Sequence, residues 1–398
     1  MHKQITSILL VAGTCIGGGT IAIPMVLSKL GIMPSIIITI LMWLLNYYPS
    51  LVGAELNLQS KQGLSLGELG KNFSGKGAQI IGEISVKVLS YAALTMYLCG
   101  ASSIIQKLLE EYFRCEVSII IIETCIAITG MILLFYPLKI ISAVNNLIFS
   151  GLIIVFLTLL GIMMGFTDYT NMPWIVNPTP RDVLSVCPVI FASFGYQLIL
   201  HTLRDYCEKD AKILKRSILI GSSIPALIYI IWSVTSLSAV FKANPDFFAL
   251  TVAGKIGVGE FVKELANISS FSHFQVMVWW MSIFAILTSF IGVSIGLAES
   301  LNLTLKNRIE VVSMRKLSAS IITVMPAYII AAIIPNAFIK ILGFTGAMVV
   351  VIGILLPVYL LFKNGMEKLH YSELKRFPLA LCVIAGIVVM AIEIFINN

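Results

Sequence analysis

Residues 13–20 (GTCIGGGT) are the part of the sequence best suited to bind a ligand, because they interrupt a long apolar stretch with glycines, and Pro24 follows one turn later. Each Gly disfavours a helix by about 1 kcal/mol relative to Ala, and Pro by about 3 kcal/mol. A helix broken at mid-membrane frees backbone N–H groups, which suit a carboxylate, and C=O groups, which suit a cation. The alternative is an unbroken helix whose small residues permit close packing. The length of the glycine run and the nearby proline favour the break.

Residues 192–197 (ASFGYQ) form a second cluster of small and polar residues, in a later apolar segment that contains Pro188. Such a cluster at mid-depth predicts a second interrupted helix. Its freed backbone groups would face those of the first break, because sites of this kind form where two discontinuous helices meet at the midplane.

A cation could bind at a third pattern, in which Ala285, Thr288 and Ser289 share one helix face (i, i+3 and i+4). One carbonyl and two hydroxyl oxygens then point the same way, and such a neutral set suits a monovalent cation such as Na⁺. The alternative is that both hydroxyls only bond to carbonyls of their own helix.

The composition of the chain is that of a polytopic membrane protein, so membrane-spanning helices must position these groups. Of 398 residues, 58% are hydrophobic and 12% charged, whereas a soluble domain has about 25% charged residues. The seven cysteines form no Cys-x-x-Cys or Cys/His cluster, so we expect buried thiols and neither disulfides nor metal ligands. The sequence lacks His-Glu-x-x-His and Walker-type motifs, its four His are scattered, and we therefore expect no enzyme.

At about 20 apolar residues per crossing, the sequence predicts an all-α protein with eleven transmembrane helices. The predicted spans are Ile5–Leu30, Ser35–Leu56, Ile80–Leu108, Val117–Tyr136, Val144–Phe166, Val183–Leu203, Ile218–Val240, Phe274–Leu303, Leu317–Pro335, Phe338–Phe362 and Pro378–Ile396. Lys and Arg concentrate in the loops that share a side with the N-terminus, such as 204–216 and 306–316. This bias predicts a cytoplasmic N-terminus and a C-terminus on the opposite side.

The two interrupted spans are the first and the sixth, which suggests two halves of five helices. We expect repeat one over residues 5–166, repeat two over 183–362 and an extra helix over 378–396, all within one transporter domain, 1–398. An odd number of helices per half inverts the second half relative to the first, as in the inverted repeats of secondary transporters.

Two loops carry further signals. Arg204–Arg216 alternates charges and predicts a short cytoplasmic helix, and Glu260–Ala266 predicts an amphipathic segment over the external mouth. An ordinary solvated connector is the alternative for both.

Ionisable residues inside predicted spans are candidates for proton coupling. We rank Glu55 and Glu299 first, near the cytoplasmic ends of their spans, and we expect Glu123 to be exposed at the outer interface. The full set is Glu55, Glu83, Lys87, Glu123, Glu299 and His201.

Several separated motifs resemble the hydroxy/aromatic amino acid permease family, the tyrosine and tryptophan permeases of bacteria. They are AGTCIGGGTIAIP, PVIFASFGY, IGSSIPALIYIIW and FAILTSFIGVSIGL, in family order over essentially the whole chain. After Phe-Gly-aromatic the family continues with His, Gly and Ile-Pro, whereas this chain continues with Gln197. The resemblance implies the amino acid–polyamine–cation superfamily and the LeuT-type fold, a 5+5 inverted repeat with helices 1 and 6 broken.

The resemblance also implies a function, which is cation-coupled symport (H⁺ or Na⁺) of an amino acid, most simply tyrosine or tryptophan, across the bacterial inner membrane. The alternatives are transport of another neutral amino acid and a non-transporting amino acid sensor. The cation site, Na⁺ or its vestige, would comprise Gly13, Ile16, Ala285, Thr288 and Ser289. The expected partners are the substrate and the lipid bilayer, and neither another cofactor nor a nucleic acid is expected. The implied substrate-binding residues are Thr14, Cys15, Gly17, Gly18, Gly19, Tyr97, Phe191, Ala192, Phe194, Gly195, Tyr196 and Gln197, and Tyr91 is a further candidate.

Overall fold

The structure, a computed structural model, describes residues 2–168, 170, 172–269, 271–306, 308–366 and 369–397, which form helices and loops and contain no strand. The elements are α1 (His2–Cys15), α2 (Gly19–Leu27), α3 (Ile32–Gln59), α4 (Leu66–Ser74), α5 (Lys76–Phe113), α6 (Ile119–Leu133), α7 (Leu138–Phe166), α8 (Pro180–Ala192), the 3₁₀ turn η1 (Tyr196–Ile199), α9 (Leu200–Tyr206), α10 (Ala211–Ala243), α11 (Pro245–Val252), α12 (Val258–Asn267), α13 (Ser272–Leu305), α14 (Val312–Ile333), α15 (Phe338–Val350), the π-helical turn η2 (Val351–Leu355), α16 (Leu356–Asn364) and α17 (Arg376–Phe395).

Membrane crossing is supported by the length and apolarity of these helices. Within the described ranges nine are long and apolar enough to span a bilayer, and ten if α1 and α2 are one bent span. All eleven predicted spans lie on helices, but α6, with 15 residues, is shorter than the length that a crossing needs. An all-helical polytopic membrane protein is thereby confirmed, whereas the number of crossings stays a prediction.

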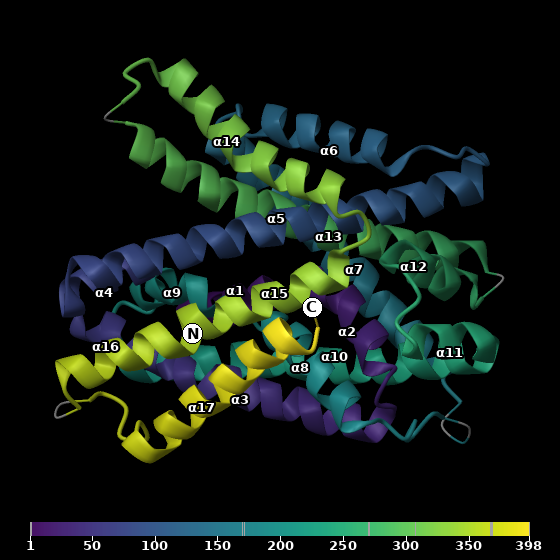
Figure 1. The fold of residues 1–398 in the computed structure, drawn as a ribbon, viewed down its shortest axis with the longest axis horizontal. Coiled ribbons are helices and arrows are strands. Elements are labelled where there is room, and N and C mark those ends of the chain that lie inside the picture. The colour runs from purple at the N-terminus through teal and green to yellow at the C-terminus, as the bar shows by residue number, and fades with distance from the viewer. Residues whose placement is uncertain are drawn as a thin grey trace.

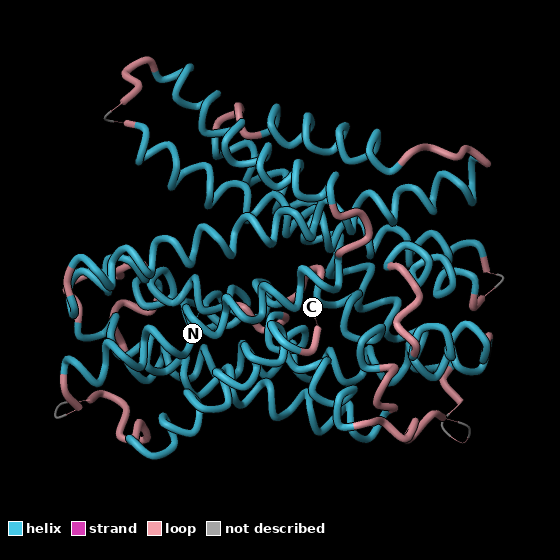
Figure 2. Tube along the Cα trace, viewed as in Figure 1, coloured by secondary structure: helices cyan, strands magenta, loops and turns pink. Residues whose placement is uncertain are grey.

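The long helices run roughly side by side, with α6 and α14 along one edge of the bundle and α3 and α17 toward the opposite edge (Figure 1). Most connections gather at the two ends of the bundle (Figure 2). Large apolar side chains point outward along the sides, including Leu147 (74% exposed), Ile154 (67%) and Leu227 (60%). An apolar surface of this extent fits contact with lipid better than contact with water.

The first predicted break is confirmed. The helix stops at Cys15 and resumes at Gly19, and the axes of α1 and α2 differ by 55°. All nine residues of α2 are buried, and this short helix packs against α8, α10, α11 and α12. The break therefore lies inside the protein, where the chain can release backbone groups without exposing them to lipid.

The second predicted break is also confirmed, in a different form. The α-helix α8 ends at Ala192, Ser193 and Phe194 form a turn, and the 3₁₀ turn η1 leads into α9.

The predicted helix over 204–216 is wrong, because the chain breaks inside it. Glu208 and Lys209 adopt positive φ angles of 49° and 65°, which end the helical path after α9. The Asp210 carboxylate then accepts bonds from the backbone N–H groups of Lys212 and Ile213 and caps α10. The segment is thus a tight connector between two helices.

The predicted amphipathic segment 260–266 lies within the helix α12. Its Phe261, Val262 and Leu265 side chains are buried, and α12 packs across α2, α5, α10 and α13.

Candidate functional site

Three consecutive backbone donors stand free at the first break. Within the described residues, the N–H groups of Gly17, Gly18 and Gly19 have no hydrogen-bond acceptor. The chain regains helical bonding with Thr20, whose N–H donates to the Gly17 carbonyl at 2.9 Å. These donors form the N-terminal end of α2, where the helix dipole favours a negative charge.

The same break leaves carbonyl oxygens free on the other side. The described residues supply no donor to the C=O groups of Gly13, Thr14 and Ile16. One break therefore offers donors at the start of α2 and acceptors at the end of α1.

The three glycines are needed for space, since none of them has a positive φ angle. A Cβ on Gly17 would collide with the Ser289 hydroxyl of α13, and a Cβ on Gly18 would lie 3.0 Å from Cε1 of Tyr97. A Cβ on Gly19 would lie 2.6 Å from Oγ and 2.8 Å from Cβ of Ser193 at the second break. Three different elements thus approach the first break at van der Waals distance.

At the second break, by contrast, the chain satisfies most of its own backbone. The Phe194 and Gly195 N–H groups donate to the carbonyls of Phe191 and Ala192, and Tyr196 N–H donates to the Phe194 carbonyl at 2.8 Å. The carbonyls of Ala192 and Phe194 therefore each hold one bond and keep one lone pair. The Phe191 carbonyl also accepts from Asn46 Nδ2 at 3.4 Å.

Two aromatic side chains of α10 tie the breaks together, and the sequence analysis missed both. The fully buried Tyr229 hydroxyl lies 2.6 Å from the Cys15 carbonyl and 3.0 Å from the Ser193 carbonyl, one from each break. Trp232 donates its indole N–H to the Thr20 carbonyl at 2.8 Å. Their spacing of three places both polar tips on one helix face, but the sequence alone does not show which helix that face meets.

A cavity of about 690 Å³ lies at the two breaks. It brings together most of the predicted residues, and Ser193, Asn145 and Phe149 join them. The predicted residues that line it are Gly13, Thr14, Cys15, Ile16, Gly17, Gly18, Gly19, Tyr97, Ala192, Gly195, Gln197, Thr288 and Ser289.

Several predicted aromatic residues lie away from the cavity. Phe191, Phe194 and Tyr196 are fully buried and do not line it. Phe194 packs edge-on against Tyr229, with ring centroids 5.4 Å apart, and the Tyr196 hydroxyl donates to Ser50 Oγ at 3.0 Å. Of the two tyrosines of α5, Tyr97 lines the cavity.

Tyr91 instead donates to the Ile322 carbonyl on α14 and lies outside the lining. Its hydroxyl therefore contributes to helix packing.

The cavity opens toward the end of the bundle that carries the start of α1 and the α3–α4 loop. Its lining continues from the breaks to the exposed residues Leu9, Ser65 and Ser300. No residue of α11 or α12 lines it, because the opposite end is closed by α2 and α12. The lining contains Lys87 and His201 but no Asp or Glu, so it suits a zwitterion or an anion better than a cationic solute.

The predicted cation ligands lie next to the first break. Thr288 and Ser289 line the cavity, whereas Ala285 is fully buried behind them. Both hydroxyls donate to their own helix, Ser289 to the Ala285 carbonyl at 3.0 Å and Thr288 to the Phe284 carbonyl at 2.9 Å. Their oxygen lone pairs remain available to a cation, so the neutral donor set fits Na⁺. The described residues contain no group of three His, Cys, Asp or Glu side chains suited to a metal ion.

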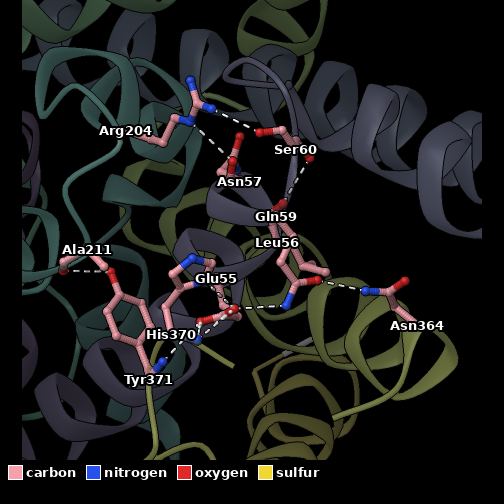
Figure 3. A network of polar contacts seen from close by, with 10 residues as sticks. All are labelled: Glu55, Leu56, Asn57, Gln59, Ser60, Arg204, Ala211, Asn364, His370 and Tyr371. Carbon is pink, nitrogen blue, oxygen red and sulfur yellow. Dashed lines mark hydrogen bonds and ion pairs between the residues drawn. The ribbon is translucent and has the colours of Figure 1, made fainter. Parts of the chain in front are cut away.

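The predicted proton-coupling residues differ in their surroundings. Glu299 is exposed, whereas Glu55 is fully buried, accepting bonds from Gln59 Nε2 at 2.8 Å and from the backbone N–H groups of His370 and Tyr371. The His370 ring also lies 3.0 Å from the Glu55 carboxylate (Figure 3). Glu55 therefore anchors the loop between α16 and α17 outside the cavity.

Arg204 has a similar anchoring role at the end of α3. It is buried and donates to the carbonyls of Asn57 and Ser60 (Figure 3). It also donates to the Lys61 carbonyl at 3.0 Å. These bonds satisfy carbonyls that the end of α3 leaves free.

Comparison with known proteins identifies relatives along nearly the whole chain. A model of the tryptophan/tyrosine permease family matches residues 1–397. The tyrosine-specific transport system 1 of Haemophilus influenzae is 28% identical over 91% of this chain and 88% of its own length. The tryptophan-specific transport protein of Pseudomonas aeruginosa is 24% identical, over 92% and 87%. The glutamine transporter 2 of Aliivibrio fischeri is 23% identical, over 98% and 99%.

Proposed function

This chain belongs to the tryptophan/tyrosine permease family, and from that premise we propose that it imports an aromatic amino acid by cation-coupled symport with alternating access. The observation that carries the proposal is the row of three unpartnered N–H groups, from Gly17 to Gly19, which faces a cavity of about 690 Å³. A cavity of this size suits one amino acid, since small-molecule sites typically measure about 300–1,000 Å³.

The substrate carboxylate binds at the first break. Gly17, Gly18 and Gly19 direct their N–H groups at it, and the helix dipole of α2 adds a favourable charge interaction. Hydrogen bonds to charged groups contribute about 1.5–3 kcal/mol each. The α-ammonium lies toward the second break, where Ala192 retains one carbonyl lone pair.

The substrate side chain lies between Tyr97 and Phe149, both of which line the cavity. Gln197 adds a polar group there, because its Nε2 donates to Asn46 Oδ1 at 2.7 Å while its buried Oε1 has no partner in the described part of the chain. That oxygen accepts the phenol O–H of tyrosine or the indole N–H of tryptophan.

Another neutral amino acid is the alternative substrate. The Gln197 oxygen would equally accept the side-chain amide of glutamine, and one relative is named as a glutamine transporter. A side-by-side affinity measurement for tyrosine, tryptophan and glutamine separates these substrates.

The coupling cation, if it is Na⁺, binds between the carbonyls of Gly13 and Ile16 and the oxygens of Ala285, Thr288 and Ser289. It would then join α1 to α13 next to the substrate, so that ion and substrate binding favour the same conformation. Proton coupling through Glu55 or Glu299 is the competing arrangement among the residues ranked from sequence.

The fold is that of a LeuT-type 5+5 inverted repeat, with an extra C-terminal helix, in the bacterial inner membrane. With a cytoplasmic N-terminus, the cavity opens to the cytoplasm, and α2 and α12 close the periplasmic side. The structure then represents the state that releases substrate inward, and rocking of the two broken helices would return it to the outward-facing state.

Uptake into proteoliposomes tests the proposal. Radiolabelled tyrosine, tryptophan and glutamine are each offered under a Na⁺ gradient, a pH gradient or neither, and we expect gradient-driven accumulation of an aromatic amino acid. Binding without accumulation would identify a sensor on a transporter scaffold, and accumulation of glutamine alone would favour the alternative substrate. The absence of uptake of any amino acid would refute the transport proposal.

A further inference from the structure

Glu123 is a buried carboxylic acid in α6 that the proposed function does not use. The sequence predicted it to be exposed at the outer interface, and this prediction is wrong, because its exposure is 1%. Ile121, two positions earlier, is 55% exposed, and Glu123 lies on the opposite helix face, toward α5. A carboxyl group in this position has been removed from both water and lipid.

Glu123 has weak hydrogen-bond support for a negative charge. Ser102 Oγ lies 3.3 Å from Glu123 Oε1 and 3.1 Å from the Cys99 carbonyl. The hydroxyl has a single hydrogen, and a carbonyl can only accept. That one hydrogen serves both the Cys99 carbonyl and Glu123 Oε1, so the carboxyl group receives at most one long, shared hydrogen bond from Ser102.

The remaining surroundings of Glu123 contain nothing to balance a negative charge. Its Oε2 is buried without a partner in the described part of the chain. The titratable groups that face this region are Cys99 from α5 and, one residue along, Tyr328 from α14, whose hydroxyl pairs with Thr124. No Lys, Arg or His of the described residues forms an ion pair with Glu123. An ionised carboxylate without a partner is far costlier to bury than the neutral acid.

The helix that closes the outer side touches α5 next to this group. Gly259 of α12 donates its N–H to Ser103 Oγ at 3.1 Å, and a Cβ on Gly259 would collide with the Ser103 carbonyl. The ion pair between Lys263 and Glu111, at 2.7 Å, holds the same two helices together. Ser103 follows Ser102 directly, so α12 contacts α5 one residue along the chain from the partner of Glu123.

We propose that Glu123 is a proton-binding residue of this transporter, protonated while α12 lies against α5 and open to outside water when α12 moves away. The link to transport rests on the proposed function. The protonated state rests only on the geometry around Glu123. On opening, the O–H bond of Glu123 breaks, its electron pair stays on the carboxylate, and the proton passes to outside water. Rebinding of a proton from outside neutralises the group and allows α12 to close again, so the proton is a condition for closure and is not itself carried across by this step.

Infrared absorption of the full-length protein in lipid nanodiscs tests the protonated state without any need for transport. At neutral pH, the area of the carbonyl band of protonated carboxylic acids should be smaller in Glu123→Gln than in the wild type, by the contribution of one carboxyl group. It should be unchanged in Glu116→Gln, the matched control, because Glu116 is exposed in the α5–α6 loop. Glu123→Asp, which keeps the acid, should shift the band and retain its area. An equal band in the wild type and in Glu123→Gln would overturn the proposal.

The role in transport is tested by uptake at varied outside pH. Wild-type initial uptake should fall about tenfold for each pH unit above the titration midpoint, as expected for one obligatory proton. Glu123→Gln should lose this dependence and still bind substrate. The same pH dependence in wild type and Glu123→Gln would overturn the role of Glu123 in closure. Absence of wild-type uptake at every pH would refute the proposed function and leave the infrared result standing.

Discussion

The two helix breaks differ in what they leave unbonded. At the first, Gly17, Gly18 and Gly19 present free N–H groups and the preceding turn presents free carbonyls. At the second, the groups from Phe191 to Tyr196 bond largely to one another. The first break therefore has the capacity to bind a ligand, whereas the second is a preformed support whose Ser193 packs on Gly19.

The difference also shows how a membrane protein can hold an open backbone in place. Tyr229 contacts one carbonyl from each break, and Trp232 bonds the carbonyl of Thr20 in the first turn of α2. The carbonyls that hydrogen-bond to α10 side chains are therefore different from the N–H groups that stay free to bind the substrate. Such prior fixing reduces the ordering that binding would otherwise require.

Substrate analogues test this contrast with the largest expected effect. An amine that lacks the carboxylate, tyramine, should bind about 1,000-fold or more weaker than tyrosine, because three charge-assisted hydrogen bonds at about 1.5–3 kcal/mol each are lost. The acid that lacks the ammonium, 3-(4-hydroxyphenyl)propanoate, should lose less, because the second break offers fewer free groups. Isothermal titration of purified protein measures both. A greater loss for the acid than for the amine would reverse the assignment of the two breaks.

Substitution of one glycine in each break is the next test. Gly19→Ala places a Cβ 2.8 Å from Cβ and 3.3 Å from Cα of Ser193, a clash that no side-chain rotation relieves. Overpacking of this kind costs about 1–3 kcal/mol, so we expect tyrosine affinity to fall about tenfold to 100-fold. Gly195→Ala is the matched control, because its Cβ would lie 3.1 Å from the Ala192 carbonyl oxygen and 3.7 Å from Cγ2 of Val349, with no contact under 3.0 Å. Equal losses in the two variants would contradict the account.

Removal of the Tyr229 hydroxyl tests the link between the breaks. Tyr229→Phe leaves the carbonyls of Cys15 and Ser193 without this donor, and a buried unsatisfied group costs about 1–3 kcal/mol. We expect a lower thermal unfolding temperature and weaker substrate binding together. In Tyr196→Phe, which loses only the bond to Ser50, stability should change while affinity does not. An unchanged affinity in Tyr229→Phe would show that the breaks are independent.

The cation ligands give the smallest expected effect. Ser289→Ala removes one neutral oxygen, which is worth about 0.5–1.5 kcal/mol, so Na⁺ affinity should fall by up to about tenfold. Na⁺-dependent thermal stabilisation of the wild type and of Ser289→Ala measures the change, with Ser300→Ala, at the mouth of the cavity, as the control. Equal Na⁺ responses in the wild type and in Ser289→Ala would show that the Ser289 hydroxyl does not bind Na⁺ and only donates a hydrogen bond within its own helix.

Features that depend on local sequence were predictable. The glycine run before Pro24 and the cluster around Gly195 carry their own helix-breaking propensity, and both breaks lie where they were expected.

Features that depend on distant contacts were not predictable from this sequence. The burial of Tyr196, the cross-links made by Tyr229 and the inward orientation of Glu123 each require knowledge of which helix packs against which. The break at Glu208 was missed because two positive φ angles in non-glycine residues leave little trace in sequence.

The most direct test of the central claim is an experimental structure with tyrosine or tryptophan bound. The account predicts carboxylate oxygens within about 3.2 Å of the backbone nitrogens of Gly17, Gly18 and Gly19. A carboxylate held elsewhere, for example by Lys87 at the side of the cavity, with those three N–H groups still unbonded, would contradict it.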